Sequence, residues 1–281
     1  MAGLLSGLSE LGLGGLENME VYEQPGDKEA EKQAEEKPEV KEETFLFDKS
    51  YECPVCYQGF KAKTVRSGKL RSLGTDRDLR PLYDQMEPLK YDVVICPHCG
   101  YAALTRFFGG LTAGQIKAIK ENISANFHPV KEEKEIYTYE EALYRYKLCL
   151  ANTIVKHGKV SEKAYICLKA GWLLRSMGEN LDPAVEDYNK KMQEIKEQEM
   201  DFLKNALDGL ITARQTESYP ICGMDEVTLE YLIAVLAMEF EKYDISSRLI
   251  YNILNTPTVN NRIKDKAREV KDELLQQMGK K

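Results

Sequence analysis

Two pairs of cysteines are the residues in this sequence best suited to chemistry. Cys53-Pro-Val-Cys56 and Cys96-Pro-His-Cys99 each leave two residues between the sulfurs, so one tight turn can aim both thiolates at a single ion. Two such turns complete a tetrahedral shell, and the proline after the first cysteine restricts each turn. The spacing therefore predicts a zinc site whose ligands are Cys53, Cys56, Cys96 and Cys99.

The predicted zinc is structural rather than catalytic. Four protein ligands fill a tetrahedral shell and leave no position for a substrate or an activated water. A module of about 60 residues also buries too little surface to be secure alone, and structural zinc contributes roughly 10–16 kcal/mol to finger peptides. Iron in a rubredoxin-like shell and a redox dithiol pair are the minor alternatives. We expect Gly100 to take a positive φ, so that backbone N–H groups face the sulfurs, and His98 to stay outside the shell.

The stretches in front of the cysteine pairs are predicted to be short strands. Aromatic or β-branched residues occupy every second position in parts of 45–51 and 91–95, which is the period of a strand. Glycines and prolines punctuate the chain between the two pairs. Residues 44–111 are therefore predicted to form a small β-rich, zinc-ribbon-like module.

The apolar spacing becomes helical from about residue 112. Thr112 and Thr138 are each followed three residues later by a glutamine or glutamate, the pattern of a capping box. Further helix starts are predicted at Ser161, Asp182 and Asp225. The connections are short, which favours antiparallel neighbours. The chain is thus predicted to be mainly α, with an all-helical domain over 112–281.

The charge of the chain is concentrated near its N-terminus. The formal net charge is −7, and residues 1–43 hold 12 acidic residues and 4 lysines, a net −8. Residues 44–281 hold 35 basic and 34 acidic residues and are close to neutral. This composition predicts a disordered acidic tail and linker over 1–43, and the overall acidity argues against a generic nucleic-acid coat protein.

The sequence also indicates a compartment. No run of about 18 apolar residues occurs, so no integral membrane segment is expected. The first residues lack the basic region and cleavage site of a secretory signal. The seven cysteines are an odd number, and four of them have metal-ligand spacing rather than the pattern of a disulfide scaffold. We therefore expect a cytoplasmic protein with reduced thiols.

A basic loop is predicted between the cysteine pairs, at 61–80. It holds seven lysines and arginines against two aspartates. The functional interpretation is a contact surface for a phosphate or a nucleic acid. The alternative is a solvated loop that partly neutralises the thiolates and pairs internally. The possible ligand-binding residues of this loop are Arg66, Lys69, Arg71, Asp76, Asp78 and Arg80.

The chain resembles the DUF2225 family of bacterial proteins over roughly 45–278. The resemblance lies in Tyr51-Glu-Cys-Pro-Val-Cys56, Arg66-Ser-Gly-Lys-Leu-Arg71, Asp76-Arg-Asp-Leu-Arg80 and Tyr91-Asp-Val-Val-Ile-Cys-Pro-His-Cys-Gly-Tyr-Ala-Ala103. It implies a zinc-ribbon-like N-terminal module, a helical remainder and a bacterial cytoplasmic origin. It implies no reaction.

The helical part resembles tetratricopeptide (TPR) repeats more weakly. The segments concerned are 139–150, 164–178 and 231–254. The repeat period is not a clean 34 residues, the Trp-x-x-Leu-Gly-x-x-Tyr signature is absent, and 182–213 is predicted as one oversized helix. A TPR-like domain implies a groove for a peptide or helix of another protein.

The sequence favours a non-enzymatic role. It contains no GxSxG, P-loop, GxGxxG or HExxH motif. Cys149 and Cys167 fall on apolar helix faces and are predicted to belong to the core, which leaves Cys222 as the only candidate reactive thiol. The predicted function is a zinc-binding adaptor for protein–protein interactions. A nucleic-acid-binding zinc ribbon is the first alternative, and an enzyme with a site between ribbon and helices, marked by a deep polar pocket beside Asp76 and Asp78, is the second.

Overall fold

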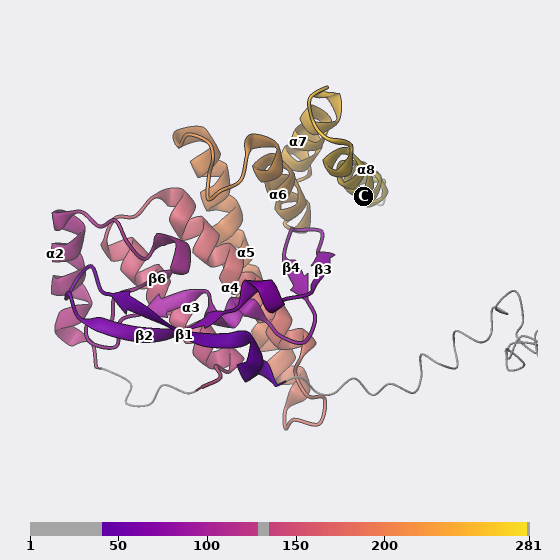
Figure 1. Cartoon of the computed structure of the whole chain (residues 1–281). Helices are drawn as coiled ribbons and strands as arrows, with labels where there is room; N and C mark the ends of the chain where they lie inside the picture. Colours follow the sequence, from indigo (N-terminus) through magenta and orange to yellow (C-terminus); the bar gives the residue numbers. More distant parts are fainter. Residues whose placement is uncertain (1–40, 129–134, 280–281) are drawn as a thin grey trace, which may run out of the picture. The chain divides into compact units, whose positions relative to one another are not determined.

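Short antiparallel strand pairs form the N-terminal part of the structure (Figure 1). The computed structural model describes residues 41–128 and 135–279, so the predicted tail up to residue 40 lies outside the described residues. Within them, three two-stranded sheets are present: β1 (Leu46–Glu52) with β2 (Gly59–Val65), β3 (Ser72–Thr75) with β4 (Pro81–Tyr83), and β5 (Val93–Ile95) with β6 (Ala102–Leu104). The predicted β-rich region is confirmed.

Helices make up the rest of the described chain, which confirms the mainly α class. The α-helices are α2 (Ala113–Asn122), α3 (Tyr139–Val155), α4 (Val160–Glu179), α5 (Tyr188–Thr216), α6 (Glu226–Glu239), α7 (Tyr243–Asn255) and α8 (Asn261–Met278). Short 3-10 helices lie at Glu42–Phe45, Ser67–Lys69, Pro88–Tyr91, Thr105–Phe107 and Ser124–Asn126. None of the helices in these two stretches is long and apolar enough to cross a membrane.

Three of the predicted helix starts are confirmed by their caps. The Thr112 hydroxyl accepts the Gln115 N–H, and the Thr138 hydroxyl accepts the Glu141 N–H. In turn, the side-chain oxygens of Gln115 and Glu141 accept the backbone N–H of Thr112 and Thr138. The Asp225 carboxylate accepts the N–H of Thr228. These signals are local in sequence, which is why the pattern alone could place them.

Two predicted helix starts are wrong. Asp182 does not begin α5, because its carboxylate accepts the N–H of Ala184 in a local turn, and the helix starts at Tyr188 after Asp187 at φ 58°. Ser161 is not a cap but lies inside α4. Its N–H and hydroxyl both donate to the Glu217 carboxylate, so a residue at the end of α5 satisfies the start of α4.

Helix α4 packs against both α3 and α5, and strands β5 and β6 lie on α3 (Figure 1). Val93 of β5 and Leu104 of β6 belong to the same buried cluster as Leu168 of α4 and Leu207 of α5. α4 and α5 approach each other closely, since a Cβ on Gly209 would lie 2.7 Å from the Ala164 Cβ. α6 is buried along most of its length, as its continuous apolar run predicts.

Consecutive helices pack in pairs along the chain. α3 contacts α4, α4 contacts α5, α6 contacts α7, and α7 contacts α8. Such pairs are what a helical repeat requires, but the TPR-like assignment and the domain boundaries at 44–111 and 112–281 stay predictions.

Candidate metal centre and charged hairpin

Each cysteine pair lies in a turn between two paired strands. Cys53 and Cys56 follow β1 and precede β2, and Cys96 and Cys99 lie in the same way between β5 and β6. We call these two turns the knuckles. The two knuckles have the same backbone hydrogen bonds. The N–H of the first cysteine donates to the carbonyl five residues later, at 3.0 Å in the first knuckle and 2.8 Å in the second. The carbonyl of that cysteine accepts the N–H four residues later, at 2.9 Å and 3.0 Å.

The residue after each second cysteine adopts a left-handed backbone. Gly100 has φ 73°, as predicted, and a side chain there would also collide with the Phe127 ring, 2.5 Å from the added Cβ. Tyr57 holds the equivalent place in the first knuckle at φ 61°, although it is not glycine, and its side chain is 64% exposed. The repeated turn therefore fixes both pairs of sulfurs in the same local geometry.

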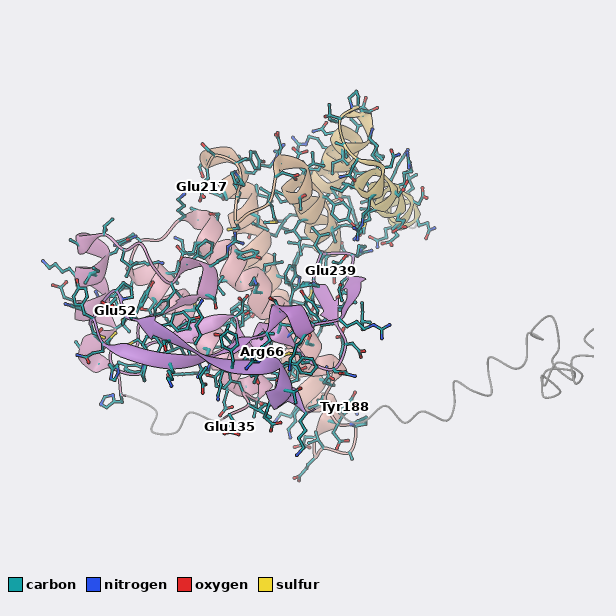
Figure 2. All side chains as sticks on the ribbon, viewed as in Figure 1. Glu52, Arg66, Glu135, Tyr188, Glu217 and Glu239 are labelled. Carbon is teal, nitrogen blue, oxygen red and sulfur yellow. The ribbon has the colours of Figure 1, made fainter. Side chains whose placement is uncertain are left out.

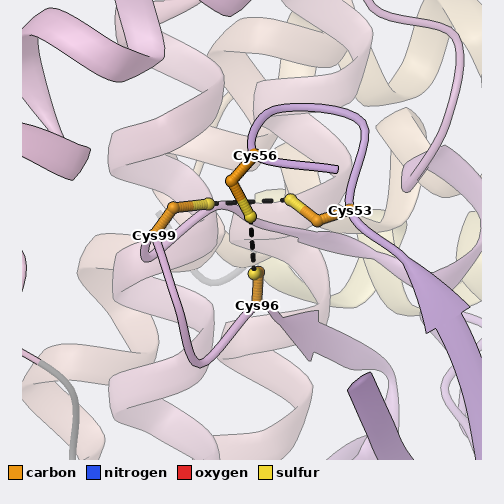
Figure 3. Close-up of side chains that lie close together, drawn as sticks. All are labelled: Cys53, Cys56, Cys96 and Cys99. Atoms are coloured by element: carbon orange, nitrogen blue, oxygen red, sulfur yellow. Dashed lines mark hydrogen bonds between the residues drawn. The ribbon is translucent and has the colours of Figure 1, made fainter. Parts of the chain in front are cut away.

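The four sulfurs point toward one another from the two knuckles (Figure 3). The Sγ atoms of Cys53 and Cys99 are 3.6 Å apart, as are those of Cys56 and Cys96, and all four lie within 4.8 Å of one another. A tetrahedral ion with metal–sulfur bonds of about 2.3 Å requires sulfurs roughly 3.8 Å apart. The four cysteines thus fit one metal ion.

The electrostatics of the sulfur cluster call for a cation. Hydrogen bonds from the Cys96 and Cys99 thiols hold the pKa of Cys53 down to about 2, and the same interactions raise the pKa of Cys96 to about 12 and that of Cys99 further. Close thiols therefore oppose one another's ionisation. All four can be thiolates together only when a bound cation compensates their charge.

The cluster is shielded by its own small core. Cys53 and Cys96 are fully buried, Cys99 is 6% exposed, and Cys56 is half-buried, whereas His98 is exposed. The rings of Tyr51 and Phe60 stack on each other in the same hydrophobic cluster, and Phe108 contacts these two rings edge-on and the Tyr101 ring at a tilt. This packing leaves the ring faces in the core rather than presenting them to a nucleic-acid base.

Hydrogen bonds join the second knuckle and its approach to α3. The Asn152 side-chain amide donates to the Gly100 carbonyl at 3.1 Å, and the Tyr146 hydroxyl donates to the Leu89 carbonyl at 3.1 Å. All of these polar atoms are buried, so each bond avoids an unsatisfied group. The sulfur cluster is consequently anchored on the helical layer.

The predicted basic loop at 61–80 is not a single loop, which corrects that prediction. Residues 61–65 belong to β2, and 72–83 form the hairpin of β3 and β4. The alternation of charged with apolar residues in β2 is a strand pattern that the count of basic residues obscured. The two halves of the stretch also have different surroundings.

The first half of the stretch stays on the surface. Arg66, at the end of β2 (Figure 2), donates through Nε to the Leu46 carbonyl at 3.1 Å and lies over the Phe47 ring. Lys69 donates to the Thr44 carbonyl at 3.2 Å, and Arg71 lies 4.0 Å from Asp84. These three cations are exposed and near solvent.

The second half of the stretch enters the helical layer. We call the β3–β4 turn with Asp76, Asp78 and Arg80 the charged hairpin. Asp78 is 4% and Arg80 2% exposed. Arg80 donates to Ser176 at 3.0 Å, to Glu179 at 2.7 Å and to Asp76. The alternative of a solvated loop that pairs internally holds only for the pair of Asp76 with Arg80. Asp78 and Arg80 are buried, and Asp78 pairs with α4.

Sequence reasoning missed the helix residues that receive this hairpin. The Trp172 indole N–H donates to Asp78 at 2.9 Å, and Arg175 pairs with the same carboxylate at 2.9 Å and with Glu199 of α5 at 2.8 Å. Burial alone would lower the pKa of Arg175, but the Asp78 carboxylate raises it above its ordinary value. The single tryptophan was the one signal in the sequence that pointed to this place, and it did not identify its partner.

The remaining cysteines are not activated. Cys149 and Cys167 are buried in the helical core as predicted, and burial raises their pKa values to about 12 and about 11. Cys222 is half-buried, and its thiol donates to the Ser161 carbonyl at 3.3 Å. Burial raises its pKa to about 11, so the thiol is protonated near neutral pH and is a poor nucleophile.

Comparison with known proteins gives one match. A family model described as an uncharacterized protein conserved in bacteria, DUF2225, matches residues 46–274, which include both knuckles, the charged hairpin and the helices from α2 to near the end of α8. No curated protein and no solved structure matches the chain.

We predict that Asp78→Asn lowers the free energy of unfolding by about 2–4 kcal/mol, because it removes a buried charge that Arg175 and Trp172 share. The matched control is Asp48→Asn, whose pair with Lys63 is half exposed and contributes at most about 1 kcal/mol. Urea unfolding of both variants at fixed zinc concentration gives the comparison. Equal losses would contradict the role given to Asp78.

Proposed function

We propose, given that this chain belongs to the DUF2225 family, that it is a non-enzymatic zinc-binding protein that acts as a protein–protein interaction adaptor. One observation carries the proposal: four cysteine sulfurs lie within 4.8 Å of one another, three of them on buried residues, and four thiolates are enough to fill a tetrahedral shell. A metal held in this way supports the fold and carries out no reaction. The functional surface then has to lie on the helices.

Zinc is the metal we assign to the cluster, with Cys53, Cys56, Cys96 and Cys99 as ligands. A closed four-thiolate shell with no redox demand suits Zn²⁺, and the two knuckles have the turn geometry of zinc ribbons. The bound ion would neutralise part of the thiolate charge and join β1–β2 to β5–β6. Val55 N–H, 3.4 Å from the Cys53 sulfur, would help to offset the remaining charge.

A groove in the helical part supports the adaptor role. It has a volume of about 660 Å³ and is lined by residues of α3, α4 and α5. Ile154 on its edge is 53% exposed, which is a large fraction for an isoleucine. We therefore propose a TPR-like helical domain over 112–281 that presents this groove to another protein, and a zinc-ribbon-like module over 44–111, in a cytoplasmic protein.

The nucleic-acid alternative has weaker support. Arg66, Lys69 and Arg71 are exposed near one another in sequence, as a phosphate-binding surface would need. Asp76, Asp78 and Arg80, the other half of the predicted contact set, instead pair with helix residues. Three exposed cations, in a part of the chain whose basic and acidic residues nearly balance, are a small basis for such a surface.

The enzyme alternative is favoured by one pocket. It has a volume of about 350 Å³ and is lined by Asp76, Asp78 and charged residues of α4, α5 and α6. Both aspartates already accept hydrogen bonds from arginines at close range, and such pairing disfavours a general base. We therefore propose that this pocket results from the packing of the charged hairpin against the helices and is not an active site.

We predict one zinc ion per chain in the purified protein, measured by plasma mass spectrometry together with a native mass. Cys53→Ser and Cys96→Ser should each reduce the zinc content strongly, because each removes one thiolate of the shell. Cys222→Ser is the matched control and should keep the full zinc content, since that thiol lies outside the cluster. Iron in the sample, or a metal-free protein with a reversible Cys53–Cys56 disulfide, would refute the zinc assignment.

A second prediction concerns the adaptor role. A photo-crosslinking residue in place of Ile154 should form an adduct with another protein in bacterial cells, because this side chain borders the groove. The same residue in place of Tyr251, which is 68% exposed on α7, is the control and should form none at the same mass. Identical adducts at both positions, or none at position 154, would count against the groove as the contact surface.

A further inference from the structure

The groove is built from three helices with regular spacing. Its lining recurs at helical intervals on each of them: Lys147, Leu150 and Ile154 on α3, Val160, Lys163, Ala164 and Cys167 on α4, and Gln198, Asp201, Phe202, Asn205, Asp208, Gly209 and Thr212 on α5. The seven-residue intervals on α3 and α4 correspond to about 10 Å, or two helical turns. The α5 wall is longer and runs from Gln198 to Thr212, about 21 Å, so the two shorter walls match two turns of another helix and α5 extends beyond them.

The inner lining of the groove is apolar. Leu150, Val160 and Phe202 are half-buried, while Ala164 and Cys167 are buried beneath them. The close packing of Gly209 on Ala164 brings α4 and α5 together along this lining. An occupant with apolar side chains would gain affinity by removing this surface from water.

The charged residues of the rim divide by sign. Lys147 and Lys163 lie on α3 and α4, whereas Asp201 and Asp208 lie on α5. The Lys147 ammonium donates to Gln198 at 3.2 Å, and Asp208 accepts from Lys242 at 2.7 Å, so these rim groups already have polar contacts. One wall therefore carries cations and the other carries anions, which favours an occupant with opposite charges on its two flanks.

The secondary structure of the occupant follows from the walls. An extended peptide binds mainly through backbone hydrogen bonds to an exposed strand edge. Here the lining residues all belong to α-helices, and Val160 is the first residue of α4. The backbone groups of a helix interior are satisfied within the helix, so the groove offers side chains and not backbone partners. A helix, whose own backbone groups are likewise satisfied, suits such a surface.

We infer that the groove binds an amphipathic α-helix of another protein, with three large apolar side chains at i, i+4 and i+7, an acidic flank toward Lys147 and Lys163, and a basic flank toward Asp201 and Asp208. This inference rests on the proposed adaptor function and specifies its partner. The apolar ridge spans the same two turns as the lining of α3 and α4. The sign of the flanks distinguishes this partner from an indiscriminate apolar helix.

The test uses three synthetic peptides of 15 residues with identical composition. The first is an alanine-based helix with leucine at i, i+4 and i+7, glutamates along one flank and lysines along the other. The second keeps the leucines but alternates the two charges on both flanks. The third moves the leucines and charges out of helical spacing, so that no single face is apolar. Binding to the full zinc-loaded chain is measured by fluorescence anisotropy at low and physiological salt.

We expect the first peptide to bind about tenfold or more tightly than the other two, with a preference over the second that shrinks at high salt. Ile154→Glu should weaken its binding by a similar factor, whereas Tyr251→Glu, on α7, should leave it unchanged. Lys163→Glu should also weaken binding, and a peptide whose glutamate flank is changed to lysine should recover part of the loss. That recovery identifies which flank faces α4, a result that general unfolding could not produce.

Several outcomes would overturn the inference. If the first and third peptides bind equally well and Ile154→Glu still weakens their binding, the groove binds peptides without requiring a helix. The inference would then be wrong, whereas the adaptor function would stand. If native mass spectrometry shows a dimer, and Ile154→Glu abolishes that dimer, the occupant of the groove is a second copy of this chain. No binding by any peptide, together with no position-specific adduct at Ile154, would remove both the inference and the adaptor function.

Discussion

Four thiol groups within 4.8 Å of one another are the constraint on which the rest of the structure depends. Like charges at this distance cannot coexist without a cation, and the opposed pKa shifts of Cys53 and Cys96 express that conflict. A bound metal ion would resolve it and would close the chain between the two knuckles into a loop. Such closure removes conformational freedom from the unfolded chain, in the manner of other cross-links. The segment 57–95 is then fixed at both ends.

The middle of that closed loop carries the charged hairpin. Asp78 and Arg80 are buried among Trp172, Arg175 and Ser176, a setting in which an unpaired charge would cost several kcal/mol. Full pairing makes the arrangement tolerable and also specific, because a shifted hairpin would leave charges unmatched. The N-terminal strand region is therefore held on the helices at two separate places, through the second knuckle on α3 and through the charged hairpin on α4.

α4 also connects the hairpin to the proposed binding groove. Its C-terminal half bears the residues that receive the hairpin, and its N-terminal half lines the groove with Val160 and Ala164. α5 also takes part in both, since Glu199 pairs with Arg175 and the neighbouring Gln198 lines the groove. A metal ion bound at the cysteines, as proposed, would thus also support the proposed groove, because the strands that it joins pack on the helices that form the groove.

The features that the sequence predicted are those that depend on neighbours in the chain. The cysteine spacing, the positive φ of Gly100 and the capping boxes at Thr112 and Thr138 are all set within a few residues. The failures arose where distant groups competed with a local signal. Glu217 occupies the start of α4 in place of a Ser161 cap, and Trp172 and Arg175 draw Asp78 out of the predicted loop. No pattern in a single sequence pairs residues that lie 94 positions apart, as Asp78 and Trp172 do.

The most direct test of this account is amide hydrogen exchange of the zinc-loaded protein compared with the same protein stripped of metal by a chelator. The account predicts that metal removal lowers protection at the knuckles and also in the β3–β4 hairpin, at amides such as Asp76 and Leu79, and along α4 near Trp172. Loss of protection confined to residues 53–56 and 96–99, with the hairpin and α4 unchanged, would contradict it.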